Sequence, residues 1–135
     1  MRATLLISVL MLEIAGHFPV VGSGQKFWDV VGMIKEDRLA EMQAMRKTGT
    51  AFESWEDQKG RTLLYFAVFL EKEDVVRYLV GDLKSDVNHV DRIGGTPLTK
   101  AIWTGNFKLC NFLCRNGADV LQRDHYGNTP LIIAA

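Results

Sequence analysis

The chain of 135 residues has only two cysteines, Cys110 and Cys114, which lie four positions apart in a segment that we expect to be helical. Two thiols at this spacing could ligate a metal ion or form a disulfide. A metal would need two further ligands, and the candidates His89 and His125 lie in separate predicted turns. Neighbours on one helix also make poor disulfide geometry. The spacing alone therefore does not establish a metal site, and two free thiols suit a reducing compartment.

Two histidines lie close to aspartates: His125 follows Asp124, and His89 stands two residues before Asp91. Such pairs can act in general acid–base catalysis. However, no serine or cysteine nucleophile has a recognisable motif around it, and both aspartates already have a role in predicted turns. We therefore expect turn residues rather than catalytic ones. The sequence predicts no enzyme activity, no cofactor and no metal site.

The glycine-rich segment 22–26, Gly-Ser-Gly-Gln-Lys, is faintly similar to a phosphate-binding loop. It lacks the leading glycine at the required spacing, and no serine or threonine follows the lysine. We interpret this segment as a flexible linker.

The elements that must position these residues are set by a motif that occurs three times, at 57–67, 91–101 and 124–134. Each copy has Asp, two variable positions, Gly, one variable position, Thr, Pro or Leu, and then Leu, with Ala three residues further on. The motif leucine recurs after 34 and then 33 residues. A fixed period in this range is typical of a solenoid, in which each unit buries its apolar face against its neighbours.

Each position of the motif has a local physical role. The aspartate can accept hydrogen bonds from its own turn, and the glycine tolerates positive φ. The threonine stands where a helix needs an N-cap, and proline fits the first helical position because its missing donor would be unsatisfied there anyway. The motif therefore predicts a tight turn followed by a short helix.

With these features the chain resembles the ankyrin repeat family, whose signature is Thr-Pro-Leu-His-x-Ala. The resemblance implies an all-α fold: an ankyrin-repeat solenoid of helix-turn-helix units with short β-turn connections. One position departs from the family, because its histidine is replaced by Tyr65, Thr99 and Ile132 in the three copies. That histidine ties turn to helix in the family, so we expect less rigid turns. The family usually has Val or Leu at Cys110 and Cys114, so we expect both thiols to be buried.

The resemblance divides the chain into five parts. They are an apolar leader or signal peptide at 1–25, a degenerate N-terminal capping repeat at 26–56, ankyrin repeats at 57–90 and 91–123, and a partial repeat at 124–135. Because the inner helix of the last part has barely begun at Ala135, we expect a C-terminally truncated stack; the alternative is that this end pairs with another chain. In the capping repeat we expect Met33, Met42 and Met45 to lie in the core. We expect Trp28 and Trp55 to pack under the cap.

Two details of the full repeats carry specific predictions. Glu71 replaces the glycine that usually joins the two helices, and the segment after the second helix of 57–90 has one extra residue. That helix should therefore end irregularly. In the next repeat Gly117 is placed for a left-handed C-cap.

The leader has one early positive charge, about ten apolar residues and a segment of small residues, which fits a secretory signal peptide. The run is too short to span a bilayer, which takes roughly 20 residues. The alternative is an apolar helix that covers the exposed end of the first unit. The protein is secreted if the leader is a signal peptide and cytoplasmic otherwise, and the free thiols favour the second location.

In the ankyrin family the turn tips and the exposed ends of the inner helices line a concave partner-binding surface. The corresponding positions here are Gln58, Lys59, Arg61, Phe69, Leu70, Arg92, Ile93, Trp103, Thr104, Arg123, His125, Tyr126 and Asn128. Phe69, Trp103 and Tyr126 would form an aromatic row flanked by cations, and aromatic and arginine side chains are the usual interface anchors. The alternative is that Phe69 and Trp103 pack against neighbouring units.

These observations favour a non-catalytic protein-protein interaction module that binds a protein partner through the concave face. Lys+Arg and Asp+Glu both total 16, so the net charge of zero gives no global footprint for nucleic acid or acidic lipid. We expect no small-molecule substrate and no membrane span. Two alternatives remain: a secreted, toxin-like ankyrin effector, and the amino-terminal part of a larger ankyrin-containing scaffold, channel or enzyme.

Overall fold

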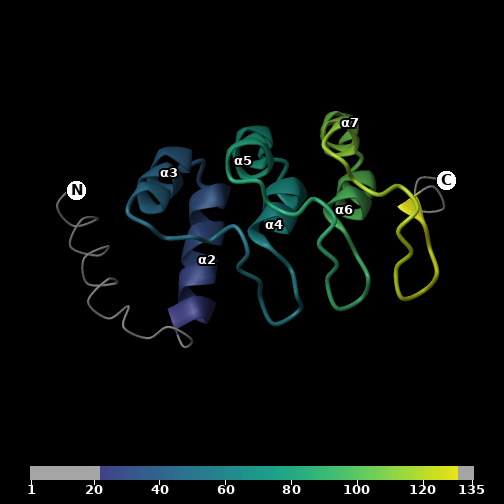
Figure 1. Cartoon of the computed structure of the whole chain (residues 1–135), viewed down its shortest axis with the longest axis horizontal. Coiled ribbons are helices and arrows are strands. Elements are labelled where there is room, and N and C mark those ends of the chain that lie inside the picture. The colour runs from purple at the N-terminus through teal and green to yellow at the C-terminus, as the bar shows by residue number, and fades with distance from the viewer. Residues whose placement is uncertain (1–21, 131–135) are drawn as a thin grey trace.

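Consecutive pairs of helices make up the part of the chain that the structure describes, residues 22–130 of a computed structural model (Figure 1). In chain order the elements are α2 (Gly22–Lys35), α3 (Leu39–Lys47), α4 (Leu63–Phe69), α5 (Glu73–Arg77), the π-helical turn η1 (Tyr78–Asp82), α6 (Pro97–Thr104) and α7 (Phe107–Arg115).

The helix pairs stack in two rows. Figure 1 shows α2, α4 and α6 in one row, α3, α5 and α7 in a second row above it, and the connecting turns extending below. The inner helix α4 packs against α2 on one side and α6 on the other, and each inner helix contacts its own outer helix. Across residues 22–130 the backbone pairs as strands only in one bridge, between Glu56 and Thr62. The structure therefore confirms an all-α solenoid of helix-turn-helix units.

A continuous core runs between the two rows. Each inner helix supplies fully buried side chains, such as Ile34, Leu64 and Ala101, and the outer helices add Met42 and Leu113. Burying an aliphatic side chain of this size contributes about 1.5–3 kcal/mol. The short helices therefore depend on packing between units for their stability.

Threonine caps begin the inner helices, as the motif predicts. The Thr62 hydroxyl accepts the backbone N–H of Tyr65 at 3.4 Å, and the Thr96 hydroxyl accepts that of Thr99 at 3.3 Å. Thr99, which replaces the family's histidine, also accepts the backbone N–H of Thr96 at 2.9 Å and completes a capping box. A threonine therefore ties this turn to its helix in place of the histidine.

The N-terminal unit differs from its prediction in two ways. The prediction of a flexible linker at 22–26 was wrong, because α2 already begins at Gly22 and continues to Lys35. Trp28 is 48% exposed and is not packed beneath the cap, although its ring makes edge contacts with those of Phe27 and Phe66. The amphipathic period of Phe27, Val30 and Ile34, all buried, explains both: it extends the helix and turns Trp28 away from the buried face.

The predictions for the methionines and Trp55 of this unit are confirmed, and the prediction for the leader concerns residues that the structure does not describe. Met42 is fully buried, and Met33, Met45 and Trp55 are partly buried against the core. Residues 1–21 of the predicted leader lie outside the described residues. No helix of the described part is long and apolar enough to cross a membrane.

The irregular features predicted around the second helix pair are present. Glu71 has a φ of 57°, the left-handed conformation that glycine usually supplies. Helix α5 passes into η1, and Lys84, just beyond it, has a φ of 56°. At the end of α7, Gly117 has the predicted left-handed φ, 93°.

The prediction of two buried thiols was wrong. Cys114 is exposed and Cys110 is only partly buried, and both are free. Leu109 and Leu113 define the buried face of α7, and each cysteine follows one of them. Because successive helical residues are turned by about 100°, the cysteines lie at the edge of that face. Burial nevertheless raises the pKa of the Cys110 thiol, and the neighbouring Cys114 adds to the rise.

Candidate binding surface

The turn aspartates hold their turns together from within. Asp57 Oδ1 accepts the backbone N–H groups of Lys59 and Arg61, both at 2.9 Å. Asp91 Oδ1 accepts those of Ile93 and Gly95 at 3.0 and 2.7 Å. The third turn repeats the pattern, with the N–H groups of Tyr126 and Asn128 at 2.9 and 2.8 Å from Asp124 Oδ1.

These hydrogen bonds lower the pKa values of Asp57 and Asp124. Burial raises the pKa of Asp57, but hydrogen bonds from the Arg61 side chain and from the N–H groups of Arg61 and Lys59 outweigh it and hold the pKa below its ordinary value. The pKa of Asp124 is lowered in the same way, with burial opposed by hydrogen bonds from Asn128 and Tyr126. The lowered pKa values of Asp57 and Asp124 therefore favour their charged forms, while their oxygens accept hydrogen bonds from their own turns.

The tips of successive turns are joined to one another through the backbone. The N–H of Arg92 donates to the carbonyl of Lys59 at 3.0 Å, and the N–H of His125 donates to the carbonyl of Ile93 at 2.9 Å. Gly94 has a φ of 85°, and a Cβ placed there would stand 2.6 Å from the backbone nitrogen of His125. The stacked tips therefore approach so closely that only glycine fits at this position.

Two side chains at the base of the turns tie units that lie about thirty residues apart. His89 Nε2 is 3.0 Å from the carbonyl oxygen of Gly60 and 2.9 Å from Glu56 Oε2. The Asn88 amide donates to the carbonyl of Gly117 at 2.9 Å and accepts the N–H of Asp119 at 2.7 Å. His89 therefore contacts Glu56 rather than Asp91, which supports its structural role and leaves no His–Asp pair there.

Nine of the thirteen predicted site residues present exposed side chains. They are Gln58, Lys59, Phe69, Arg92, Ile93, Trp103, Arg123, His125 and Tyr126. Among the hydrophobic members, the exposed fractions are 79% for Tyr126, 72% for Trp103, 59% for Ile93 and 48% for Phe69. These values exclude the alternative in which Trp103 packs against a neighbouring unit within residues 22–130.

The other four predicted residues are partly buried and engaged within the fold. Arg61 forms an ion pair with Asp57 at 2.6 Å, and its guanidinium lies 4.8 Å from the centre of the Phe66 ring. Leu70 packs against the core, and the Thr104 hydroxyl donates to the carbonyl of Ala101 at 2.9 Å. The Asn128 amide donates to Asp124 Oδ2 at 3.2 Å. Their contacts indicate that these residues shape the surface rather than offer free groups to a partner.

The three aromatic residues predicted as one row occupy two different positions. Phe69 ends α4, and Trp103 lies at the equivalent position near the end of α6, whereas Tyr126 stands at a turn tip. Within residues 22–130 no ring contact joins Tyr126 to either of the others. The surface therefore has a helix part and a turn part.

One residue that the sequence did not point to, Lys100, belongs to the helix part. Lys100 on α6 lies with its Nζ 4.5 Å from the centre of the Phe69 ring and 5.5 Å from that of Tyr65. Such cation–π contacts join adjacent inner helices. A sequence signal exists for Lys100, since it precedes Trp103 by three positions on one helix face, but its partner on α4 becomes visible only in the stacked structure.

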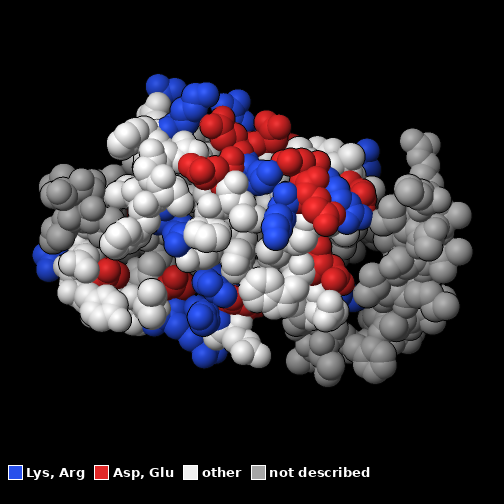
Figure 2. Space-filling view, turned by 180° about the vertical axis from the view of Figure 1, so that it is seen from behind, with Lys and Arg blue, Asp and Glu red and all other residues white. Residues whose placement is uncertain are grey.

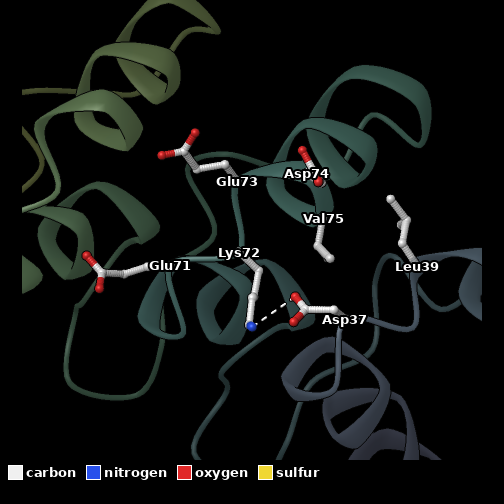
Figure 3. Close-up of a pocket in the computed structure, with 7 residues that line it drawn as sticks. All are labelled: Asp37, Leu39, Glu71, Lys72, Glu73, Asp74 and Val75. Atoms are coloured by element: carbon white, nitrogen blue, oxygen red, sulfur yellow. Dashed lines mark ion pairs between the residues drawn. The ribbon is translucent and has the colours of Figure 1, made fainter.

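An acidic hollow of ≈ 410 Å³ lies away from these residues, between the first two helix connections (Figure 3). Lys72 and Asp37 point toward one another and form an ion pair at 2.9 Å, while Glu71 and Glu73 point away from them. Among the described residues no group of three or more His, Cys, Asp or Glu side chains is arranged to hold a metal ion. The hollow therefore offers carboxylates but no built metal site.

Comparison with known families identifies the repeats. The model of the family described as "Ankyrin repeats (3 copies)" matches residues 41–124. This range begins within α3 and ends at the third turn aspartate, so it covers both predicted full repeats and residues 41–56 of the predicted capping repeat.

Individual relatives are similar over a comparable part of the chain. The NF-kappa-B inhibitor alpha of Sus scrofa is 31% identical over 117 residues, which is 82% of this chain and 36% of that protein. The neurogenic locus Notch protein of Drosophila melanogaster is 32% identical over 108 residues, 79% of this chain and 4% of that protein. The diacylglycerol kinase zeta of Rattus norvegicus is 27% identical over 103 residues, 76% of this chain and 11% of that protein. The chain thus spans about a third or less of these relatives.

Proposed function

The chain belongs to the ankyrin repeat family, and we propose from this premise that it is a non-catalytic module that binds a protein partner. The partner contacts the face formed by the turn tips and the exposed ends of α4 and α6. Fold alone does not give function, so the proposal depends on what this face offers.

The observation that carries the proposal is the combination of exposed anchors with a rigid support. Trp103 and Tyr126 are more than two-thirds exposed, and aromatic side chains are the residues that most often dominate binding energy. The turn tips are tied together at 2.9–3.0 Å by backbone hydrogen bonds. A preordered surface loses little conformational entropy on binding, which favours affinity.

The relatives support the same class of function. By its name, the NF-kappa-B inhibitor alpha acts on another protein, and its similarity covers 82% of this chain. The rat relative is a kinase, but only 11% of that protein is matched here. His89, one of the two histidines near an aspartate, is engaged by Glu56 and Gly60, which supports a structural role for it.

A second candidate places the stack within a larger ankyrin-containing scaffold, channel or enzyme, where it supplies only the partner contact. The observation that favours it is the small share of the relatives that is matched, between 4% and 36%. Sequencing of the full transcript tests this candidate, and a stop codon directly after Ala135 counts against it.

The test compares two aromatic truncations on the two helices of one pair. Trp103→Ala removes a ring that is 72% exposed near the end of the inner helix α6, and Phe107→Ala removes one that is 82% exposed at the start of the outer helix α7. Proteins captured by the tagged chain are quantified by mass spectrometry. We expect the specific partner to be retained by Phe107→Ala and lost, or weakened at least about tenfold, with Trp103→Ala.

Two results would overturn the assignment. One is equal capture by both variants, and the other is a Trp103→Ala chain that no longer unfolds cooperatively, since that would make Trp103 a structural residue.

A further inference from the structure

The exposed charges at the turn tips are all of one sign. We define the turn-tip ledge as the two residues that follow each turn aspartate: Gln58, Lys59, Arg92, Ile93, His125 and Tyr126. Lys59 and Arg92 are its permanent charges, and Arg123 stands just before the third aspartate. None of these three cations forms an ion pair with another described residue.

The acidic residues of the same turns form no ion pair with these three cations. Asp57, Asp91 and Asp124 each accept two backbone N–H groups of their own turns. Glu56, the acidic residue that precedes the first turn, lies 2.9 Å from His89. Figure 2 shows from behind that one group of Lys and Arg side chains lies at the lower edge, where the turns extend in Figure 1. The larger group of Asp and Glu lies above it, over the helices, together with further Lys and Arg.

The ledge changes character along the stack. Its first two turns carry the cations Lys59 and Arg92, and its last two carry the apolar side chains of Ile93 and Tyr126, which are 59% and 79% exposed. The backbone bonds Arg92 N–H to Lys59 and His125 N–H to Ile93 keep the tips in a fixed order. A ligand that lies along the ledge therefore meets positive charge first and apolar surface next.

We propose that the ledge binds an extended peptide segment of a protein partner that carries carboxylates about three residues from an apolar or aromatic side chain. This inference rests on the proposed function and names the chemistry of its partner. Packed helices lie about 8–10 Å apart, so successive tips recur at roughly that distance. An extended chain rises about 3.3 Å per residue, so about three peptide residues span the distance between neighbouring turn tips.

A nucleic acid fits the ledge less well. Besides Arg61, which is paired with Asp57, the described turns offer three permanent cations, Lys59, Arg92 and Arg123. The whole chain has zero net charge and a pI of about 6.8. Nucleic-acid-binding domains are typically basic over a whole face. Carboxylates interspersed with apolar groups match the mixed surface better than a run of phosphates does.

The experiment begins with a phage-displayed library of random 12-residue peptides selected on the full chain. We expect the enriched peptides to carry Asp or Glu about three positions from a Leu, Phe, Tyr or Trp. Synthetic, fluorescein-labelled versions of these peptides are then titrated by fluorescence anisotropy, with affinity falling as salt rises. A single-stranded oligonucleotide of 12 nucleotides serves as a second probe.

Two variants of equal charge change locate the binding. Lys59→Gln/Arg92→Gln removes two cations from the ledge, and Lys108→Gln/Arg115→Gln removes two exposed cations from α7. We expect the first variant to bind the peptides about tenfold more weakly and the second to bind as the wild type does.

The outcomes separate this inference from the proposed function. Three results would overturn the proposal of an acidic peptide ligand. The selection could enrich neutral or basic peptides, the ledge variant could bind the peptides as tightly as the wild type does, or the oligonucleotide could bind more tightly than the peptides. Peptides that depend on Trp103 but not on the ledge would overturn that proposal as well, while supporting the proposed function. A selection that enriches no peptide would count against the ledge, and if Trp103→Ala also retained every captured protein, both proposals would fail.

Discussion

The turns and the helix connections of this stack solve the same conformational problem in different ways. Each turn places glycine where the backbone must be left-handed, at Gly60, Gly94 and Gly127. The first two helix connections instead force Asp37 and Glu71 into that conformation, with φ of 59° and 57°. A left-handed conformation costs a residue with a side chain about 1–2 kcal/mol. Strain therefore lies at the connections, and the turns are free of it.

The difference extends to charge. At the turns the aspartates accept backbone N–H groups, and the exposed side chains of the tips include the cations Lys59 and Arg92 and the apolar Ile93 and Tyr126. At the connections Asp37, Glu71, Glu73 and Asp74 line an acidic hollow, and only Asp37 forms an ion pair there, with Lys72. The unstrained, internally bonded turns therefore expose Lys59, Arg92, Ile93 and Tyr126, whereas the first two helix connections carry strain and carboxylates.

The largest expected loss of stability comes from the close approach of neighbouring turn tips, which two glycine substitutions distinguish from the cost of a left-handed backbone. Gly94→Ala adds a Cβ that would stand 2.6 Å from the backbone nitrogen of His125, at a φ of 85°. Gly105→Ala is the control, because its φ is 73° but nothing lies within 4 Å of the added carbon. Urea denaturation should show a loss of about 3 kcal/mol or more for Gly94→Ala and about 1 kcal/mol for Gly105→Ala. Equal losses would show that the tips are not held in close contact.

The next effect tests the bonds between units. Asn88→Ala removes two hydrogen bonds to residues 29 and 31 positions away, so we expect a loss of about 1–2 kcal/mol. Asn116→Ala removes one bond to Phe112, within its own helix, and should cost about 0.5–1 kcal/mol. Thermal or urea unfolding measures both. A larger loss for Asn116→Ala would contradict the view that the bases of the turns join the units.

A pH dependence should follow from the acidity of the turn carboxylates. The folded-state pKa of Asp57 is below its ordinary value of 3.8, so the unfolded chain binds more protons in acid. The stability from this carboxylate is present above the unfolded pKa and is lost as pH falls through the folded pKa. Asp57→Asn should therefore flatten the fall of the urea midpoint below about pH 5.

The control for this experiment is Glu73→Gln at the helix connection, a carboxylate for which the described residues provide no hydrogen bond. We expect the acid dependence of Glu73→Gln to follow the wild type. An Asp57→Asn profile as steep as the wild type would contradict the role given to the turn hydrogen bonds.

The smallest effect is a gain in stability. Glu71→Gly relieves the left-handed strain and should stabilise the stack by up to about 1 kcal/mol. Glu71→Ala removes the same carboxylate but keeps the strain, so it should give no such gain. Differential scanning calorimetry of the two variants separates these causes, and equal melting temperatures would show that the carboxylate, not the conformation, matters.

Local rules in the sequence account for much of the fold. The Asp–Gly turns, the Thr62 and Thr96 caps and the irregular end of α5 all follow from bonds within a few residues. The exposure of Cys114 and Trp28 was not predicted, since it depends on how each helix is rotated against its neighbours. Lys100 and Asn88 were also missed, because their partners lie about thirty residues away and meet them only when the units stack.

The candidate surface could be predicted only in outline. The family resemblance indicated thirteen positions, and nine of them are exposed. It could not show that Arg61 and Asn128 are held by turn aspartates, nor that Tyr126 and Trp103 lie on different parts of the surface. These features arise from side chains that are particular to this chain.

The most direct measurement of the central claim is hydrogen exchange, followed by mass spectrometry, on the chain alone and with the partner that Trp103→Ala fails to capture. We predict that the partner slows exchange in the turns 57–62, 91–96 and 124–128 and around Phe69 and Trp103, with little change in α3, α5 and α7. Protection confined to α3, α5 and α7, with the turns unchanged, would contradict the account.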